Sequence, residues 1–152
     1  MEREKMSAKD VAKWFLAYNR EMMNEGDAEY ISNLKLQKLL YYAQGCFLAL
    51  KGQALFGEPI VAWKHGPVVE DVYHQYKEYG ASGIVFDEKF DFSSISSDTE
   101  AVLEEVYDVF GQYSAWKLRN MTHNETPWKS TKQNSVIPAE VIRNYFLEEY
   151  VV

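Results

Sequence analysis

Hydrophobic positions recur at helical spacing along most of the chain, and residues 34–51 carry the strongest pattern. One stripe of apolar side chains at helical spacing consists of Leu36, Leu39, Leu40, Ala43, Phe47 and Leu50. A second row, with members seven residues apart, consists of Leu34, Tyr41 and Leu48. A helix that is apolar around most of its surface is usually buried in the middle of a fold. We therefore predict a central helix over 34–51, capped by Ser32 or Asn33 and ended by Gly52.

Shorter amphipathic stretches predict the other helices. The first follows Ser7, which forms a capping box with Asp10, and it stops in the polar segment 24–29. Segment 87–98 is acidic and serine-rich and predicts a loop. The remaining helices are expected over 68–79, from Asp98 or Thr99 to Phe110, over 114–123 and from Ile137-Pro138 onward, with one extra turn at Thr126-Pro127.

A short β element is expected beside the break at Gly66-Pro67. Ile60–Trp63 is apolar and favours β structure, but four residues cannot stand alone as a strand. The nearest partner of similar character is 84–86. Pro67 suits the first turn of the helix that follows, where no amide donor is required. The pattern thus predicts one mainly α domain over 1–152, with about six helices around 34–51 and a minimal β element near 60–63 and 84–86.

Charge narrows the range of partners. The 152 residues have a formal net charge of −7, which disfavours nucleic acid because phosphate backbones repel an acidic protein. Acidic side chains concentrate in 87–108, which contains eight of them and a single lysine. This segment is interpreted either as a solvated loop and helix face or as a docking surface for a basic partner.

Cysteine use and the N-terminus indicate the compartment. Cys46 is the single cysteine and lies in an apolar helical stripe, so we expect a buried small side chain and a reducing environment. Segment 1–5 is charged and lacks the apolar core of a signal peptide. No apolar run approaches the ~20 residues that a membrane span needs. These features predict a cytoplasmic protein without a membrane partner.

The histidines are the candidates for chemistry. His74 lies one helical turn from a carboxylate on each side, which is typical of a surface pair. No spacing of histidines, cysteines and carboxylates is typical of a metal site. His65 and His123 each lie in a compact cluster, and with Glu125 they could perform general acid–base work. However, no nucleophile motif or phosphate-binding loop accompanies them. We predict no catalytic, cofactor or metal site.

Aromatic side chains near the same break are candidates for contacts with a protein partner. The chain has eleven tyrosines and four tryptophans, and these residues often dominate the energetics of interfaces. The sequence does not distinguish surface aromatics from core ones. The candidate partner-binding residues are Trp63, His65, Gly66, Pro67, Tyr76, Tyr79, His123 and Trp128.

Spaced motifs extend over nearly the whole chain, from Val11 to Phe146. They are Leu34-Lys-Leu-Gln-Lys-Leu-Leu-Tyr-Tyr-Ala-Gln-Gly45, Leu55-Phe56, Pro59-Ile60-Val-Ala-Trp63, Gly66-Pro67-Val68-Val69 with Val72-Tyr73, and Leu118, Thr122-His123, Glu125 and Pro127-Trp128. Together they resemble the Panacea domain family of SocA-like antitoxins, whose members are also described as phage-associated proteins. Relatives often carry Tyr where this chain has His65, so no shared role is transferred to that side chain.

The resemblance implies a mostly helical domain that binds and neutralises a toxin encoded nearby. Some relatives resemble adaptors that deliver a toxin to a cellular protease, and the family is not known for catalysis. We therefore expect an antitoxin that acts by direct protein–protein binding. Two alternatives stay open: a small hydrolase or transferase using His65, His123 and Glu125, and a DNA-binding regulator of its own operon.

Overall fold

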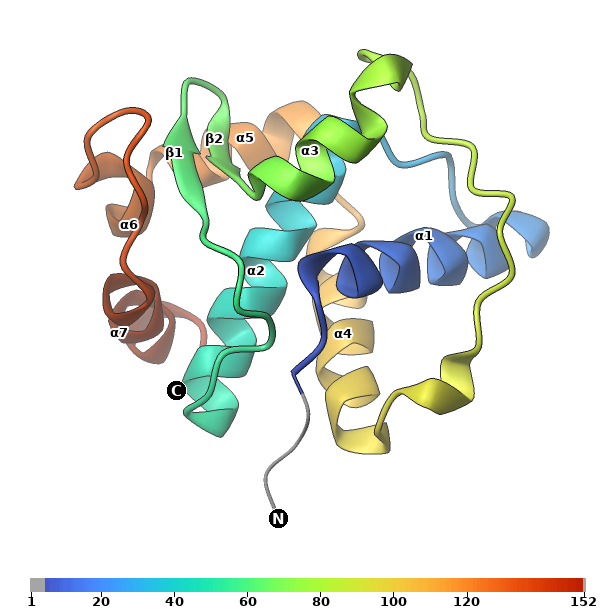
Figure 1. Cartoon of the computed structure of the whole chain (residues 1–152), viewed down its shortest axis with the longest axis horizontal. Helices are drawn as coiled ribbons and strands as arrows, with labels where there is room; N and C mark the ends of the chain where they lie inside the picture. Colours follow the sequence, from blue (N-terminus) through green and yellow to red (C-terminus); the bar gives the residue numbers. More distant parts are fainter. Residues whose placement is uncertain (1–4, 152) are drawn as a thin grey trace.

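The computed structural model describes residues 5–151, and the helix α2 (Asn33–Lys51) runs through its centre (Figure 1). The Ser32 hydroxyl caps this helix by accepting a hydrogen bond from the Lys35 amide at 3.2 Å. Gly52 ends it in the left-handed conformation, with φ at 69°. Most side chains of α2 are buried, so the predicted central helix is confirmed.

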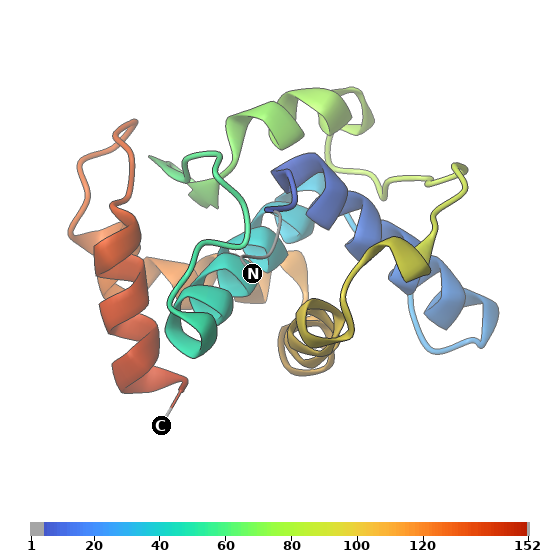
Figure 2. The same cartoon turned by 60° about the horizontal axis from the view of Figure 1, so that its bottom comes forward.

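The other helices surround α2. Figure 2 shows α7 on one side of α2 and α1 and α4 on the other, with α3 lying across them. The prediction of a mainly α fold is confirmed, since residues 5–151 contain seven α-helices and one two-stranded sheet. The helices besides α2 are α1 (Ala8–Asn24), α3 (Glu70–Tyr76), α4 (Ser97–Phe110), α5 (Ala115–His123), α6 (Thr126–Lys129) and α7 (Ala139–Glu149), with 3-10 turns η1 (Lys77–Tyr79) and η2 (Phe92–Ser94).

None of the helices in residues 5–151 combines the length and the apolar character needed to cross a membrane. The charged N-terminal segment that argued against a signal peptide lies, apart from Lys5, outside the described residues.

The sheet differs from the prediction in its second strand. β1 (Val61–Trp63) pairs with β2 (Gly66–Val68) in an antiparallel hairpin, so the expected partner at 84–86 is wrong. Local pairing closes a far smaller loop and therefore loses less chain entropy. Ile84 instead donates one backbone hydrogen bond, of 2.8 Å, to Ile31.

Pro67 consequently lies in β2 rather than in the first turn of α3, which begins at Glu70.

The free edge of β1 is covered by the segment 134–137. Its Ile137 amide donates to the Ile60 carbonyl at 2.8 Å, and the Ala62 amide donates to the Ser135 carbonyl at 2.9 Å. The short hairpin is thus held on both sides of β1.

Buried polar side chains of α2 form hydrogen bonds to the main chain of the loop at 55–56, the hairpin and α3. Each bonds to a backbone group of another segment, which pairs polar groups that burial removes from water. The bonds are Gln44 with the Leu55 amide (2.7 Å) and the Phe56 carbonyl (2.8 Å), Gln37 with the Val69 amide (2.9 Å), Asn33 with the Tyr73 carbonyl (3.0 Å) and Lys38 with the Pro67 carbonyl (3.2 Å). The central helix therefore positions the hairpin and α3.

Candidate functional site

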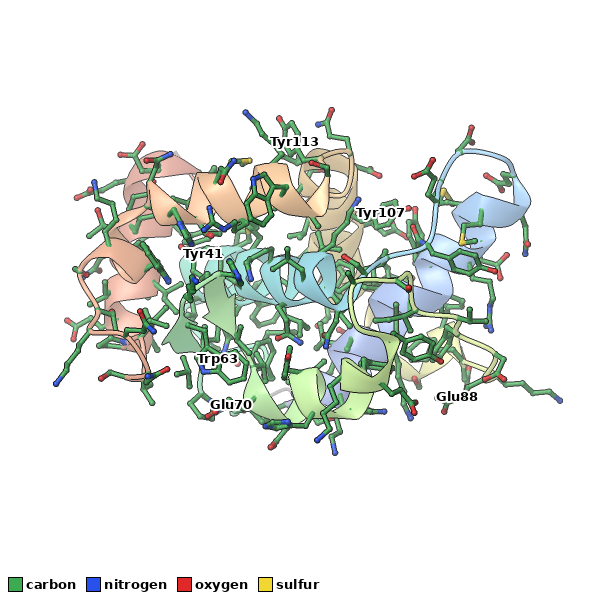
Figure 3. All side chains as sticks on the ribbon, turned by 90° about the horizontal axis from the view of Figure 1, so that it is seen from above. Tyr41, Trp63, Glu70, Glu88, Tyr107 and Tyr113 are labelled. Carbon is green, nitrogen blue, oxygen red and sulfur yellow. The ribbon has the colours of Figure 1, made fainter. Side chains whose placement is uncertain are left out.

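The hairpin and α5 lie side by side, which Figure 3 shows from above. We call this region the hairpin surface and define it by Trp63, Lys64, His65, Trp116, Arg119, His123 and Trp128. Trp116 is 55% exposed, and the Arg119 guanidinium lies over its ring, 4.4 Å from the centroid. Arg119 Nε also donates to His65 Nδ1 at 3.2 Å. An indole, a guanidinium and an imidazole therefore meet where solvent can reach them.

A second aromatic group holds the hairpin against the segment after α5. Trp128 Nε1 donates to the Trp63 carbonyl at 2.8 Å. The His123 ring stacks on Trp128, with centroids 3.9 Å apart and planes within 5°. Trp63 packs edge-on against Tyr73, 4.9 Å between centroids. These half-buried rings fix the shape of the hairpin surface from behind.

The structure brings together some of the predicted partner-binding residues and separates others. Trp63, His65, His123 and Trp128 belong to the hairpin surface, and Gly66 and Pro67 lie beside them but are buried. The two tyrosines point elsewhere: Tyr76 is buried, and the Tyr79 hydroxyl donates to the Val85 carbonyl at 3.2 Å. Partner binding by any of these residues stays a prediction.

Trp116 and Arg119 were missed by the sequence reasoning. Their position in the short helix predicted over 114–123 could have indicated that they lie on its exposed face. Leu118 of that helix is fully buried, which turns the side chain two residues earlier toward solvent. An exposed tryptophan followed three residues later by arginine places the two side chains on one helix face.

Lys38 lies behind the hairpin surface and is fully buried. Its Nζ donates to the Pro67 carbonyl at 3.2 Å. Burial, with the charge of Arg119 adding to it, lowers the pKa of this ammonium from 10.5 to about 7. An ammonium with so low a pKa loses its charge readily near neutral pH.

Replacing Lys38 by Met is expected to remove a pH dependence of stability. In the folded chain Lys38 is neutral above about pH 7, whereas in the unfolded chain it stays protonated up to about 10.5. The unfolded state binds more protons in that window, so the free energy of unfolding rises with pH, by up to about 1.4 kcal/mol per pH unit. Urea unfolding between about pH 7 and pH 8.5, below the usual range of tyrosine titration, measures the slope. An equal slope in Lys38→Met would contradict this assignment.

Gly66 allows the hairpin to approach Lys38. Its φ is +112°, and a Cβ there would lie 2.6 Å from Lys38 Cε and 2.9 Å from Thr122 Oγ1. Both the backbone conformation and the contact therefore favour glycine.

Gly66→Ala is expected to lower the free energy of unfolding by about 1–3 kcal/mol, because it adds strain at a positive φ and a clash behind the hairpin. The matched control is Gly57→Ala, where a Cβ meets nothing within 4 Å. Chemical unfolding of both variants measures the difference. Equal stabilities would show that the hairpin shifts without cost.

Glu125 is buried in the core and accepts hydrogen bonds from three tyrosines. The Tyr41 and Tyr42 hydroxyls donate to it at 2.9 Å each, and that of Tyr150 donates at 2.5 Å. Burial raises the pKa of the Glu125 carboxyl, although the three hydroxyls oppose the shift. The proximity of the negative carboxylate also raises the pKa of Tyr41 and Tyr42, in addition to the effect of their own burial. Glu125 therefore serves a structural hydrogen-bond network.

This network bears on the hydrolase or transferase alternative, which required His65 and His123 to converge with Glu125. The two imidazoles lie at the hairpin surface, whereas the carboxylate faces tyrosine hydroxyls. The arrangement expected of that alternative is not formed. Within residues 5–151, no group of three or more histidine, cysteine or acidic side chains is placed to hold a metal ion.

An open hollow of about 880 Å³ lies elsewhere, between the end of α1, the end of α4 and the start of α5. Three of its polar side chains already bond within the protein. Lys35 Nζ donates to the Gly111 carbonyl at 2.6 Å, and the Tyr107 hydroxyl donates to Asn19 Oδ1 at 2.7 Å. The hollow is therefore a weaker candidate than the hairpin surface for binding a partner.

Comparison with known proteins supports the resemblance seen in the motifs. Residues 36–129, more than half of the chain, match the family described as antitoxin SocA-like, Panacea domain. Antitoxin SocA of Caulobacter vibrioides (strain NA1000 / CB15N) is 49% identical over 55 residues, which are 36% of this chain and 29% of that protein. The match thus spans less than a third of the curated relative. No solved structure matches significantly. The chain belongs to the SocA-like antitoxin family with a Panacea domain.

Proposed function

We propose that this chain is an antitoxin that neutralises a cognate protein toxin by binding it directly through the hairpin surface. Family membership supports the antitoxin role. One observation carries the choice of surface: Trp116 is 55% exposed while Arg119 lies over its ring. Tryptophan and arginine are enriched among the residues that dominate binding energy.

Hydrogen bonds within the chain orient Arg119 without any partner. Arg119 is held by His65 through Nε, at 3.2 Å, and by Asn120 through Nη1, at 3.0 Å. A side chain that is already oriented loses less conformational entropy on binding. Pre-organisation of this kind favours a stable complex over a transient one.

Co-expression with the protein encoded beside this chain tests the proposal. The unaltered chain is expected to restore growth and to co-purify with the toxin. Trp116→Ala and Arg119→Ala are each expected to weaken binding by about 30-fold or more and to abolish the rescue, because each removes a central anchor.

Two variants at comparably exposed positions serve as controls. Tyr30 is 54% exposed, and Arg143 is exposed on α7. Tyr30→Ala and Arg143→Ala are expected to keep the rescue. Rescue that survives both hairpin-surface variants but fails in either control would place the toxin on another surface.

Delivery of the toxin to a cellular protease is a separate route to neutralisation. Pulse-chase labelling distinguishes the two routes. Direct neutralisation leaves the half-life of the toxin unchanged or longer, because binding alone restores growth. A half-life shortened by this chain would assign it an adaptor role instead.

A further inference from the structure

We propose that the hairpin surface is an oxyanion site, in which a carboxylate or phosphate group binds Arg119 and His65 in front of buried Lys38. The inference names the chemistry that this surface recognises. It rests on the proposed function only for the claim that the carboxylate comes from the toxin.

Positive and titratable nitrogen groups gather here without an acidic partner. They come from α2, the hairpin and α5, and they are Lys38, Lys64, His65, Arg119 and His123. The charges of Arg119 and Lys38 act on both imidazoles in the repulsive sense. Among residues 5–151, the ion pair found within 4 Å joins Lys13 to Glu88, away from this cluster. A bound anion would offset this repulsion.

Several donors of the cluster have no described acceptor. The protonated Lys38 Nζ carries three N–H groups, and one of them forms a hydrogen bond, to the Pro67 carbonyl. His123 donates from its other ring nitrogen to the backbone of Lys64, so its Nε2, which is buried without a partner, becomes a donor when the ring is protonated. Buried polar atoms are normally paired, and an unpaired one often marks the place of a water or ion. The unpaired nitrogen atoms therefore support an anion site independently of the positive charges of the cluster.

The outer pair of side chains has the geometry for an oxyanion. Arg119 uses Nε and Nη1 within the protein, which leaves Nη2 as a donor without a described acceptor. His65 accepts at Nδ1, so in the neutral ring the proton lies on Nε2, and His65 is exposed. A planar guanidinium beside an imidazole N–H suits carboxylate or phosphate oxygens. Lys38, which is fully buried, would act through space.

Titration of the three histidine rings by NMR tests the site in the isolated chain. Sulfate, a permanent oxyanion, and acetate are compared with chloride at constant ionic strength, so that general screening is the same. Partial burial and the charges of Arg119, Lys64 and Lys38 lower the pKa of His65, and burial and neighbouring charges likewise lower that of His123. Sulfate is expected to raise the pKa of both rings by about 1 and to leave exposed His74 unchanged.

Variants identify the groups responsible. Arg119→Gln is expected to remove most of the sulfate effect, Lys64→Gln at an exposed position to reduce it, and the distant Arg143→Gln to leave it intact. Equal responses of His65, His123 and His74, or an unaltered response in Arg119→Gln, would overturn the proposal. Dispersed backbone amide signals in the NMR spectrum of each variant show that it is folded.

The source of the oxyanion follows from repeating the titration in the complex with the toxin. If a toxin carboxylate occupies the site, sulfate no longer shifts His65; if a free phosphate is the ligand, the response persists. Since the isolated chain needs no toxin, a missing sulfate response would reject the oxyanion site and leave the rescue experiment unaffected. Failure of rescue with a clear sulfate response would reject only the proposed function.

Discussion

Glu125→Ala is expected to lower the free energy of unfolding by about 2–6 kcal/mol, the largest loss that we expect from a polar substitution. The change removes the acceptor shared by three hydroxyls. Tyr41 and Tyr42 are fully buried, so their hydroxyls would each lose the acceptor without access to bulk water. Tyr150 is 37% exposed and can turn to solvent, so it adds little to the loss.

Urea unfolding of Glu125→Ala against Glu148→Ala measures this effect. Glu148 is exposed on α7, and its removal is expected to change stability by no more than about 0.5 kcal/mol. A loss below about 1 kcal/mol for Glu125→Ala would mean that water or another group replaces the carboxylate. The hydrogen-bond network would then contribute little to holding the C-terminal helix.

Leu39→Ala is expected to cost about 2–5 kcal/mol, and Leu40→Ala a similar amount, because each leaves a cavity in the centre of the fold. Both side chains are fully buried in α2. α2 packs against α1, α4, α5 and α7, so the surrounding elements cannot collapse into the gap without disturbing one another.

Leu50→Ala provides a control on the same helix with the same chemical change. Leu50 is 53% exposed, and its loss is expected to alter the free energy of unfolding by less than about 0.5 kcal/mol. Denaturant unfolding compares the three variants. A cost under about 1 kcal/mol for both Leu39→Ala and Leu40→Ala would place the core elsewhere.

The central helix could be predicted because apolar side chains cover most of its surface and Gly52 ends it. Its buried polar side chains could not. Gln37, Gln44 and Lys38 would be assigned to solvent by any pattern of hydrophobic and polar positions. Their acceptors and donors are backbone groups 11 to 32 residues away in sequence, and only the folded chain brings these together.

The second strand of the β element could not be predicted from the sequence pattern either, for a different reason. The strand at Ile60–Trp63 was expected, but its partner was assigned to 84–86 because Gly66-Pro67 resembled the start of a helix. Proline in a strand is tolerated where its missing amide faces away from a partner, as in the edge strand β2. The pattern alone did not separate a hairpin from a strand–helix junction.

The candidate site was predictable in part. Trp63, His65, His123 and Trp128 come from two segments of sequence and do lie at one surface. Trp116 and Arg119 were missed because their helix is short and weakly patterned. Tyr76 and Tyr79 were assigned by residue type alone, which does not say whether an aromatic ring is buried.

The most direct test of the account is the affinity of the purified chain for the protein encoded beside it, measured by isothermal titration calorimetry. We predict a stable complex that Trp116→Ala weakens by about 30-fold or more, while Tyr30→Ala leaves the affinity within about threefold. Binding that is equal in Trp116→Ala and the unaltered chain, or no binding at all, would contradict neutralisation through the hairpin surface.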